Sequence, residues 1–327
     1  MFDIITFGSA TRDLFLFSQN FSLVKNRGFP TGDGLCVPAG SKIYLDDIAF
    51  ASGGGGTNTA ATFALQGLKC AYVGKVGDDP GGRDLLRELA KRGIDHRWVK
   101  TDAKNRTAYS VVLSKGGADR TILVYRGACH RLEKKDVVWP DLQAKWFYLA
   151  PLSGASVHLF GELLALAEKN QIAVALNPGQ TQLALGQKVF ARLMEKIAVL
   201  ILNQEEGAKI TGLDFHRDEQ ILQKLKSWTA GLVVLTKGKA GLLAADNQYI
   251  YKAGIPPSGI IDRTGAGDAF GSGLVTKLIK GASFQEAIAY GTANATSCVQ
   301  QIGAKNGLLP ENQWGEWEKV KVLKYKL

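Results

Sequence analysis

The most informative segment of the chain runs from residue 260 to residue 273: Ile260-Ile261-Asp262-Arg263-Thr264-Gly265-Ala266-Gly267-Asp268-Ala269-Phe270-Gly271-Ser272-Gly273. Apolar residues lead into a tight turn of small residues, and the segment that follows has helical periodicity. At the start of such a helix the amides of Gly265, Ala266 and Gly267 have no partner within the helix, and the glycines let an anion approach the backbone. The stretch therefore predicts an anion site at the head of a late helix.

Asp268 lies in the first turn of this expected helix, directly beside the anion site. A carboxylate next to a bound phosphate costs repulsion, so a loop that only holds phosphate is not expected to carry one. Its presence is explained if Asp268 accepts the proton of a hydroxyl that attacks the phosphate. The alternative is that Asp268 is a first-turn acid that complements the helix dipole.

The pattern Asp-x-Thr-Gly-Ala-Gly-Asp at 262–268, followed by a helix of small residues, resembles the C-terminal signature of the ribokinase family, the PfkB carbohydrate kinases. The resemblance implies an ATP-dependent phosphotransferase in which Asp268 is the catalytic base and the amides of Gly265, Ala266 and Gly267 form an anion hole. It also implies Mg²⁺ and, at Asp262, part of a carbonyl-lined site for a monovalent cation such as K⁺. On the residues alone, Asp262 could instead be a loop-start acid that bonds its own turn amides.

The glycine-rich run 52–58 resembles the N-terminal signature of the same family, Gly-Gly-x-Gly-x-Asn. The resemblance implies that Gly53 and Gly54 hinge a lid and approach a sugar, and that Asn58 hydrogen-bonds sugar hydroxyls. Some relatives have a lysine at the third position, where this chain has Gly55. A flexible linker is the alternative, but linkers seldom run straight into a helix.

Asp13 follows the first expected strand, 3–8. In α/β sheets ligands bind at the carboxyl ends of the strands, and a carboxylate there can accept hydrogen bonds from two sugar hydroxyls. Its position matches the sugar-binding Asp of the family. An ordinary turn Asp is the alternative.

Polar residues follow two further expected strands, 172–176 and 199–202. Asn203 and Glu206 have the spacing of a capping box at a helix start. The resemblance implies that Glu206 also organises hydrated Mg²⁺ near the phosphates, which is compatible because Mg²⁺ keeps several waters. Asn177 likewise matches a family position at the phosphate end of the cleft.

The nucleotide contacts implied by the resemblance are Thr236 and Gly238, after the expected strand 232–236, and Asn294, on the helix that follows Ser283. Asn294 is expected to line an adenine pocket together with Ala295 and Cys298. The Thr236 loop could also be a plain β-turn between two strands, and Asn294 could be a solvent-facing helix residue.

Apolar runs alternate with helices along most of the chain and predict an α/β fold: a doubly wound, mostly parallel sheet flanked by helices. Helix ends are legible, as at Asp79-Pro80, an expected N-cap followed by a first-position proline. We expect a single ribokinase-like domain over 1–327.

Two insertions, approximately 12–50 and 97–128, break the alternation and are expected to form a small β-sheet lid. The second contains a hairpin signal: apolar runs at 108–113 and 120–125 around a turn at 115–117. A lid would exclude water from a phosphoryl-transfer site. In several relatives the lids clasp into dimers, and Phe15, Phe17 and Tyr44 could make that contact here; packing between lid and core is the alternative.

The composition restricts the setting of the protein. The chain has 327 residues, a formal net charge of +10 and no apolar run long enough for a membrane span. The N-terminus is typical of a strand rather than a signal peptide, and the four cysteines lack paired spacing, so a cytoplasmic location is expected. The basic residues are dispersed, which argues against nucleic-acid binding. The lysines at 319–326 are expected to form a solvated tail.

The acceptor is expected to be a sugar or sugar-like molecule. Residues 149–154 lack the Glu that ribokinase-like members place after the middle strand, so ribose is in doubt. A nucleoside or sugar-phosphate kinase and a non-catalytic sugar- or nucleotide-binding regulator are the alternatives. An acidic substrate could be held by arginines near the lid, unless these only cover its surface: Arg12, Arg106, Arg120 and Arg126.

Overall fold

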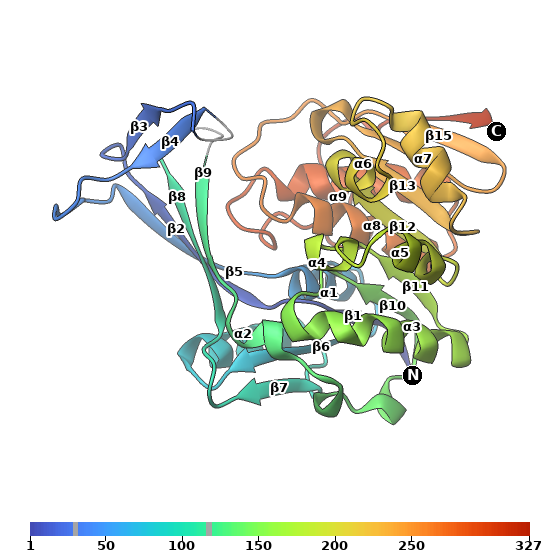
Figure 1. Cartoon of the computed structure of the whole chain (residues 1–327), viewed down its shortest axis with the longest axis horizontal. Helices are drawn as coiled ribbons and strands as arrows, with labels where there is room; N and C mark the ends of the chain where they lie inside the picture. The colour runs from blue at the N-terminus through green and yellow to red at the C-terminus, as the bar shows by residue number, and fades with distance from the viewer. Residues whose placement is uncertain (29–31, 116–119) are drawn as a thin grey trace.

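The apolar runs form one large sheet in a computed structural model that describes residues 1–28, 32–115 and 120–327 (Figure 1). Its described strands lie in the order β16 (Val322–Lys326), β15 (Tyr249–Ala253), β14 (Leu242–Ala245), β13 (Leu232–Thr236), β12 (Val199–Asn203), β11 (Ala173–Leu176), β10 (Ala144–Leu149), β1 (Phe2–Phe7), β6 (Cys70–Gly77) and β7 (Val99–Asp102). From β13 through β7 all pairs are parallel, whereas β14, β15 and β16 are added antiparallel.

Helices cover both faces of this sheet because its strands are apolar on both sides. In β1, Ile4 belongs to one buried cluster and Ile5 to the other. The first cluster includes residues of α1 (Gly55–Leu65), α2 (Pro80–Lys91), α8 (Ala266–Ile279) and α9 (Phe284–Cys298). The second includes residues of α3 (Leu159–Lys169), α4 (Gln180–Leu183), α5 (Gln187–Met194), α6 (Gln204–Thr211) and α7 (Asp218–Lys226). The predicted doubly wound, mostly parallel fold is confirmed.

The register of the parallel strands aligns their carboxyl ends. Phe7 pairs with Leu149, Leu149 with Leu176, and Asn203 with Thr236. The segments that leave β1, β10, β11, β12 and β13 therefore start along one edge of the sheet, which is where ligands bind in folds of this type.

A small four-stranded sheet stands to one side of the large sheet, at the left of Figure 1. Its order is β5 (Asp47–Gly53), β2 (Thr11–Phe17), β8 (Ala108–Ser114) and β9 (Arg120–Tyr125), and a ribbon of β3 (Ser22–Lys25) and β4 (Asp33–Cys36) lies near its far end. The antiparallel pairing of β8 with β9 confirms the predicted hairpin, although its turn at Gly116 and Gly117 falls outside the described residues. The strands come from both predicted insertions, and we call this sheet the lid.

One detail of the predicted lid differs in the structure. The second lid segment begins later than expected, because Val99–Asp102 forms β7 and pairs with β6 in the large sheet. Phe15 is buried and its ring stacks on Phe17 at 6.5 Å, so its contacts are within the chain. Tyr44, by contrast, is 78% exposed.

The last two of the C-terminal lysines belong to a strand rather than to a free tail, although all four lysines at 319–326 are exposed. Val322–Lys326 is the edge strand β16, and the Lys324 ammonium lies 3.6 Å from the centroid of the Tyr249 ring on the neighbouring strand. A strand of alternating Lys and apolar residues fits a sheet edge, because charged side chains discourage further pairing there.

Asp79 joins the large sheet to the root of the lid. Its Oδ1 accepts hydrogen bonds from the Gly82 amide (2.8 Å), which caps α2 as predicted, and from the Thr107 hydroxyl (2.7 Å). Its Oδ2 accepts from the Thr107 amide (2.8 Å), just before β8. Burial raises the pKa of Asp79, but the bonds from Thr107 and Gly82 outweigh it, so the pKa lies below its usual range.

Asp79→Ala is expected to destabilise the fold by about 2–4 kcal/mol, because it removes a helix cap and leaves two buried Thr107 donors unpaired. Urea unfolding at neutral pH measures the loss. Since the pKa of Asp79 is lowered in the folded state, its contribution is present above the unfolded pKa and disappears as the pH falls through the folded pKa. Asp84→Ala, which breaks an exposed pair with Arg87 on the same helix, is the control and should cost little. Equal losses for both variants would contradict this role.

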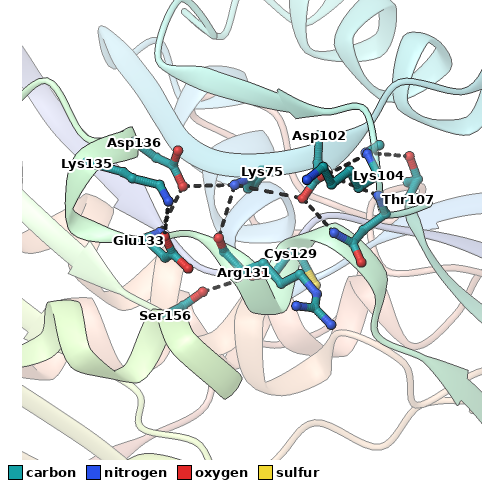
Figure 2. A network of polar contacts seen from close by, with 12 residues as sticks. Lys75, Asp102, Lys104, Thr107, Cys129, Arg131, Glu133, Lys135, Asp136 and Ser156 are labelled. Carbon is teal, nitrogen blue, oxygen red and sulfur yellow. Dashed lines mark hydrogen bonds and ion pairs between the residues drawn. The ribbon is translucent and has the colours of Figure 1, made fainter.

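Lys75 holds the chain that returns from the lid (Figure 2). Its ammonium lies 2.9 Å from the Asp136 carboxylate and 3.8 Å from that of Asp102, and it donates to the Arg131 carbonyl at 3.1 Å. Lys75 is on β6 and Asp102 on β7, whereas Arg131 and Asp136 follow β9. Both chain connections of the second lid segment are thus tied to the same edge of the large sheet.

Candidate active site

Asn58 and Asp268 meet although 210 residues separate them in the chain. The Asn58 Nδ2 donates to Asp268 Oδ2 at 2.8 Å, from the first turn of α1 to the first turn of α8. Asn58 Oδ1 is buried and has no hydrogen-bond partner within the described part of the chain. A buried acceptor left unpaired is unfavourable, so this atom is suited to receive a hydroxyl from a bound molecule.

The environment of Asp268 raises its pKa. Burial is the main cause, and it outweighs the Asn58 amide and the Lys305 ammonium, which both lower the pKa. A carboxylate with a raised pKa is a better proton acceptor than an exposed one. Asp268 therefore has the electrostatic setting of a general base.

Two glycines shape the turn before Asp268. Gly265 caps α8 with a left-handed φ of 80°, and a Cβ there would collide with Ala304. A Cβ at Gly267 would meet nothing within 4 Å, so packing within the protein does not require this glycine. The space beside Gly267 fits an anion at the helix start, although the Ala266 amide already makes a long bond of 3.4 Å to the Arg263 carbonyl.

Asp13 lies on β2 and is only 5% exposed. Its Oδ1 accepts a hydrogen bond from the Thr11 hydroxyl at 3.1 Å. Gly53 is required beside it, because a Cβ at Gly53 would collide with Asp13 Oδ2. Burial raises the pKa of Asp13, partly offset by hydrogen bonds from Ser110 and Thr11 and by the charge of Lys305. The carboxylate and the glycine run are thus in contact.

Lys305 belongs to this site and was not predicted. Its ammonium donates to the Ser52 hydroxyl at 2.9 Å and lies 3.9 Å from Glu88, and its side chain is almost fully buried. Burial lowers the pKa of Lys305 to about 8. Its positive charge partly offsets the burial that raises the pKa values of Asp13 and Asp268. The sequence signal was the one charged residue in the segment 302–309, which otherwise holds only Asn306 and small or apolar residues.

A cavity of about 310 Å³ reaches the head of α8, where Ala266 and Gly267 line it. Thr236 and Gly238, the expected nucleotide contacts, also line this cavity. The remaining walls are largely apolar and include Leu242, Ile255, Ile260, Phe270, Ala295 and Val299. An apolar cavity that ends at a helix N-terminus has the shape and polarity for a nucleotide.

Asn294 does not line this cavity. Its Nδ2 donates to the Ala269 carbonyl (2.8 Å) and its Oδ1 accepts from the Leu309 amide (2.9 Å), and the residue is fully buried. Its helix neighbour Ala295 reaches the cavity instead. The expected adenine contact of Asn294 is therefore replaced by a contact that fixes α9 to α8, and Cys298 is likewise not part of the wall.

Asn177, Asn203 and Glu206 lie at the same sheet edge. Asn177 follows β11 and donates to the Ile201 carbonyl at 3.0 Å. Asn203 and Glu206 form the predicted capping box, with bonds of 2.8 and 2.9 Å. Burial, with the nearby charge of Glu205, raises the pKa of Glu206. Among the described residues no group of three His, Cys, Asp or Glu gathers into a metal site.

Asp262 is held by both the anion turn and the lid. It accepts hydrogen bonds from the Thr264 amide and hydroxyl and from the Gly303 amide, at 2.7–3.0 Å. The Arg120 guanidinium, at the start of lid strand β9, lies 2.9 Å from its Oδ1. Of the four arginines near the lid, Arg106 and Arg126 are exposed and Arg12 is half-buried.

This fold and site define a class: a lidded α/β kinase with an acid and an amide-lined turn at the head of a late helix. Residues 1–312 match the family model "pfkB family carbohydrate kinase". A ribokinase from Haemophilus influenzae is 30% identical over 282 residues, 82% of this chain and 88% of its own length. A cytidine kinase from Thermococcus kodakarensis is 24% identical and covers 87% of this chain and 94% of its own. A structure of Arabidopsis thaliana ribokinase complexed with ribose and ATP has a TM-score of 0.74 at 21% identity, covering 95% and 96% of the two chains.

The chain belongs to the pfkB family of carbohydrate kinases. It is accordingly a kinase of sugar or nucleoside type. Within the described residues, none of the helices combines the length and the apolar character needed to cross a bilayer.

Proposed function

We propose that the protein transfers the γ-phosphoryl group of ATP to a hydroxyl of a sugar or sugar-like acceptor. The observation that carries this proposal is the hydrogen bond between Asn58 and Asp268. It places the amide that we assign to acceptor binding next to a carboxylate at the start of α8, beside the Gly265 turn that we expect to bind phosphate. The acceptor oxygen attacks the γ-phosphorus, the bond from that phosphorus to the bridging oxygen of ADP breaks, and Asp268 takes the hydroxyl proton.

We assign roles to the other residues on the basis of their positions. Asp13, Asn58 and the glycines at 53 and 54 hold the acceptor, with Asn58 Oδ1 receiving one of its hydroxyls. The amides of Gly265, Ala266 and Gly267 stabilise the charge on the transferred group. The nucleotide occupies the cavity lined by Thr236 and Gly238.

Magnesium would be held near Glu206 through water, with Asn177 and Asn203 at the phosphate end of the same edge. When bound, Mg²⁺ neutralises phosphate charge. Glu206 Oε2 is already engaged by the Asn203 amide at 2.9 Å, which leaves its other oxygen to orient a water of the ion.

The direct test is an ATP-consumption assay against a panel of free sugars, nucleosides and sugar phosphates, with the product's phosphate position determined. The panel includes nucleosides because one relative is a cytidine kinase. Phosphorylation of a free sugar supports the proposal. Turnover only with nucleosides or sugar phosphates would show that one of these is the acceptor instead. ATP and sugar binding without any turnover would favour a regulator.

Asn58→Ala is expected to lower kcat/KM about tenfold, the worth of one neutral hydrogen bond to the acceptor. It also removes an amide that lowers the pKa of Asp268, so that pKa should rise further. Because the base is active only when deprotonated, the acid limb of the kcat profile should move to higher pH. A pH series on both proteins measures this, with Asn247→Ala on the β14–β15 turn as control. An unmoved acid limb would contradict the coupling.

We further propose a homodimer formed through the lid, which exposes Tyr44, Phe50 and Leu123. Light scattering on the purified protein tests this by measuring its molecular mass. The wild type should have the mass of a dimer, and Phe50→Asp should have the mass of a monomer. The four cysteines are free thiols, as a reducing cytoplasm would keep them.

A further inference from the structure

Four donors of the chain already surround the carboxylate of Asp262. Its Oδ1 accepts hydrogen bonds from the Thr264 amide (3.0 Å) and the Thr264 hydroxyl (2.7 Å) and also lies 2.9 Å from the Arg120 guanidinium. Its Oδ2 accepts from the Gly303 amide (3.0 Å). Since each oxygen has about two lone-pair directions, Oδ1 is fully used and Oδ2 keeps one direction. A monovalent cation bound at Oδ1 would have to displace one of these donors.

The charge of Asp262 is also already balanced. Asp262 is 5% exposed and the Arg120 side chain 22%, so the pair is largely shielded from water. A guanidinium remains charged at any accessible pH. The position that would attract K⁺ therefore holds a permanent cation of the chain itself.

The neighbouring carbonyls are engaged as well. The Thr264 and Ala304 carbonyls lie 3.6 and 3.5 Å from the Cys298 Sγ, within hydrogen-bond distance for sulfur. Burial, with the charges of Asp268 and Asp262, raises the pKa of the Cys298 thiol to about 12, so it stays protonated and its single proton is shared between these two carbonyls. Together with the Arg120 charge and the donors on Asp262 Oδ1, this arrangement is a poor fit to a carbonyl-lined cation site.

We propose that Arg120 takes the place of the monovalent cation that the family resemblance implies at Asp262, so that the protein works without K⁺. Arg120 is a positioning residue: it fixes Asp262, which holds the loop of Thr264 and the loop of Gly303 on either side of the anion turn. Arg120 is the first residue of lid strand β9, so the positive charge beside Asp262 is supplied by the lid. The effect on turnover rests on the proposed kinase function, but the effect on cation binding does not.

The test compares the wild type with Arg120→Gln in KCl and in tetramethylammonium chloride at equal ionic strength. Thermal unfolding and kcat/KM are both measured. The wild type should show the same Tm and the same kcat/KM in both salts. Arg120→Gln leaves a buried carboxylate without a cation, so its kcat/KM should fall about 10²-fold in tetramethylammonium chloride through loss of alignment. KCl should restore much of this activity and raise the Tm of the variant by about 2 °C or more.

Arg83→Gln is the matched control, because it removes an arginine from an exposed ion pair with Asp78 at 3.2 Å. It should show no response to K⁺. A wild type that gains Tm or activity in KCl over tetramethylammonium chloride would overturn the proposal, and so would an Arg120→Gln protein that folds but ignores K⁺. If Arg120→Gln does not fold, two measurements still test the proposal. One is the Tm of the wild type in the two salts, and the other is the response to K⁺ of Arg120→Lys, which keeps the charge. The melting measurements stand even if no acceptor is phosphorylated, which separates this inference from the proposed function.

Discussion

Asp268→Asn is expected to lower kcat by about 10²–10⁴-fold, the usual contribution of a general base. The substitution keeps the size of the side chain, and its amide oxygen can still accept the 2.8 Å bond from Asn58. The Gly265 turn and the cavity lined by Thr236 and Gly238 are untouched. ATP affinity should therefore be retained while the proton acceptor is lost.

Steady-state kinetics with the acceptor found in the panel, together with calorimetric titration of ATP, separates these two effects. Asp78→Asn is a suitable control, since it removes an exposed carboxylate near the start of α2, away from the site. Turnover close to that of the wild type in Asp268→Asn would show that another group takes the proton. A matching loss of ATP affinity would show instead that Asp268 shapes the nucleotide site.

Asp13→Asn is expected to give the second largest effect, a fall in kcat/KM of about 10²–10⁴-fold. A hydrogen bond to a charged group contributes about 1.5–3 kcal/mol, and Asp13 is proposed to accept two from the acceptor. Its burial strengthens the expectation, because little water is available to replace these bonds. The loss should appear chiefly as a raised KM for the acceptor, whereas the KM for ATP stays the same.

Asp47→Asn serves as its control, because Asp47 lies on β5 of the same lid, paired with Phe17 at the far end of β2, and is exposed. Initial rates over a range of acceptor concentrations at saturating ATP measure the change. An unchanged KM for the acceptor in Asp13→Asn would remove Asp13 from the binding site, even with the fold intact.

The parallel sheet and the lid were predictable because both rest on local patterns. Buried parallel strands are continuous apolar runs, as in Val199–Leu202, and the Asp79-Pro80 pair predicts a capped helix that the structure contains. The two signatures were predictable for a related reason. The shape of the Gly265 turn depends on backbone geometry that small residues alone allow, so it leaves a mark in the sequence.

What the sequence did not reveal depends on long-range contacts. Arg120 pairs with Asp262 across 142 residues, and Lys305 reaches Ser52 from the far end of the chain, so no spacing rule connects them. Asn294 was misplaced because its helix is buried on two faces, and periodicity does not say which face meets the cavity. Strand β16 was missed because an edge strand with alternating lysines has the composition of a solvated tail.

The bond between Asn58 and Asp268 also has a consequence for synthesis on the ribosome. Asn58 is translated early, and its carboxylate partner follows only after more than half of the chain. A nascent polypeptide that still lacks α8 has neither Asp268 nor the Gly265 turn. On the proposed mechanism it therefore cannot consume ATP, and turnover begins only late in translation, once α8 has packed against α1.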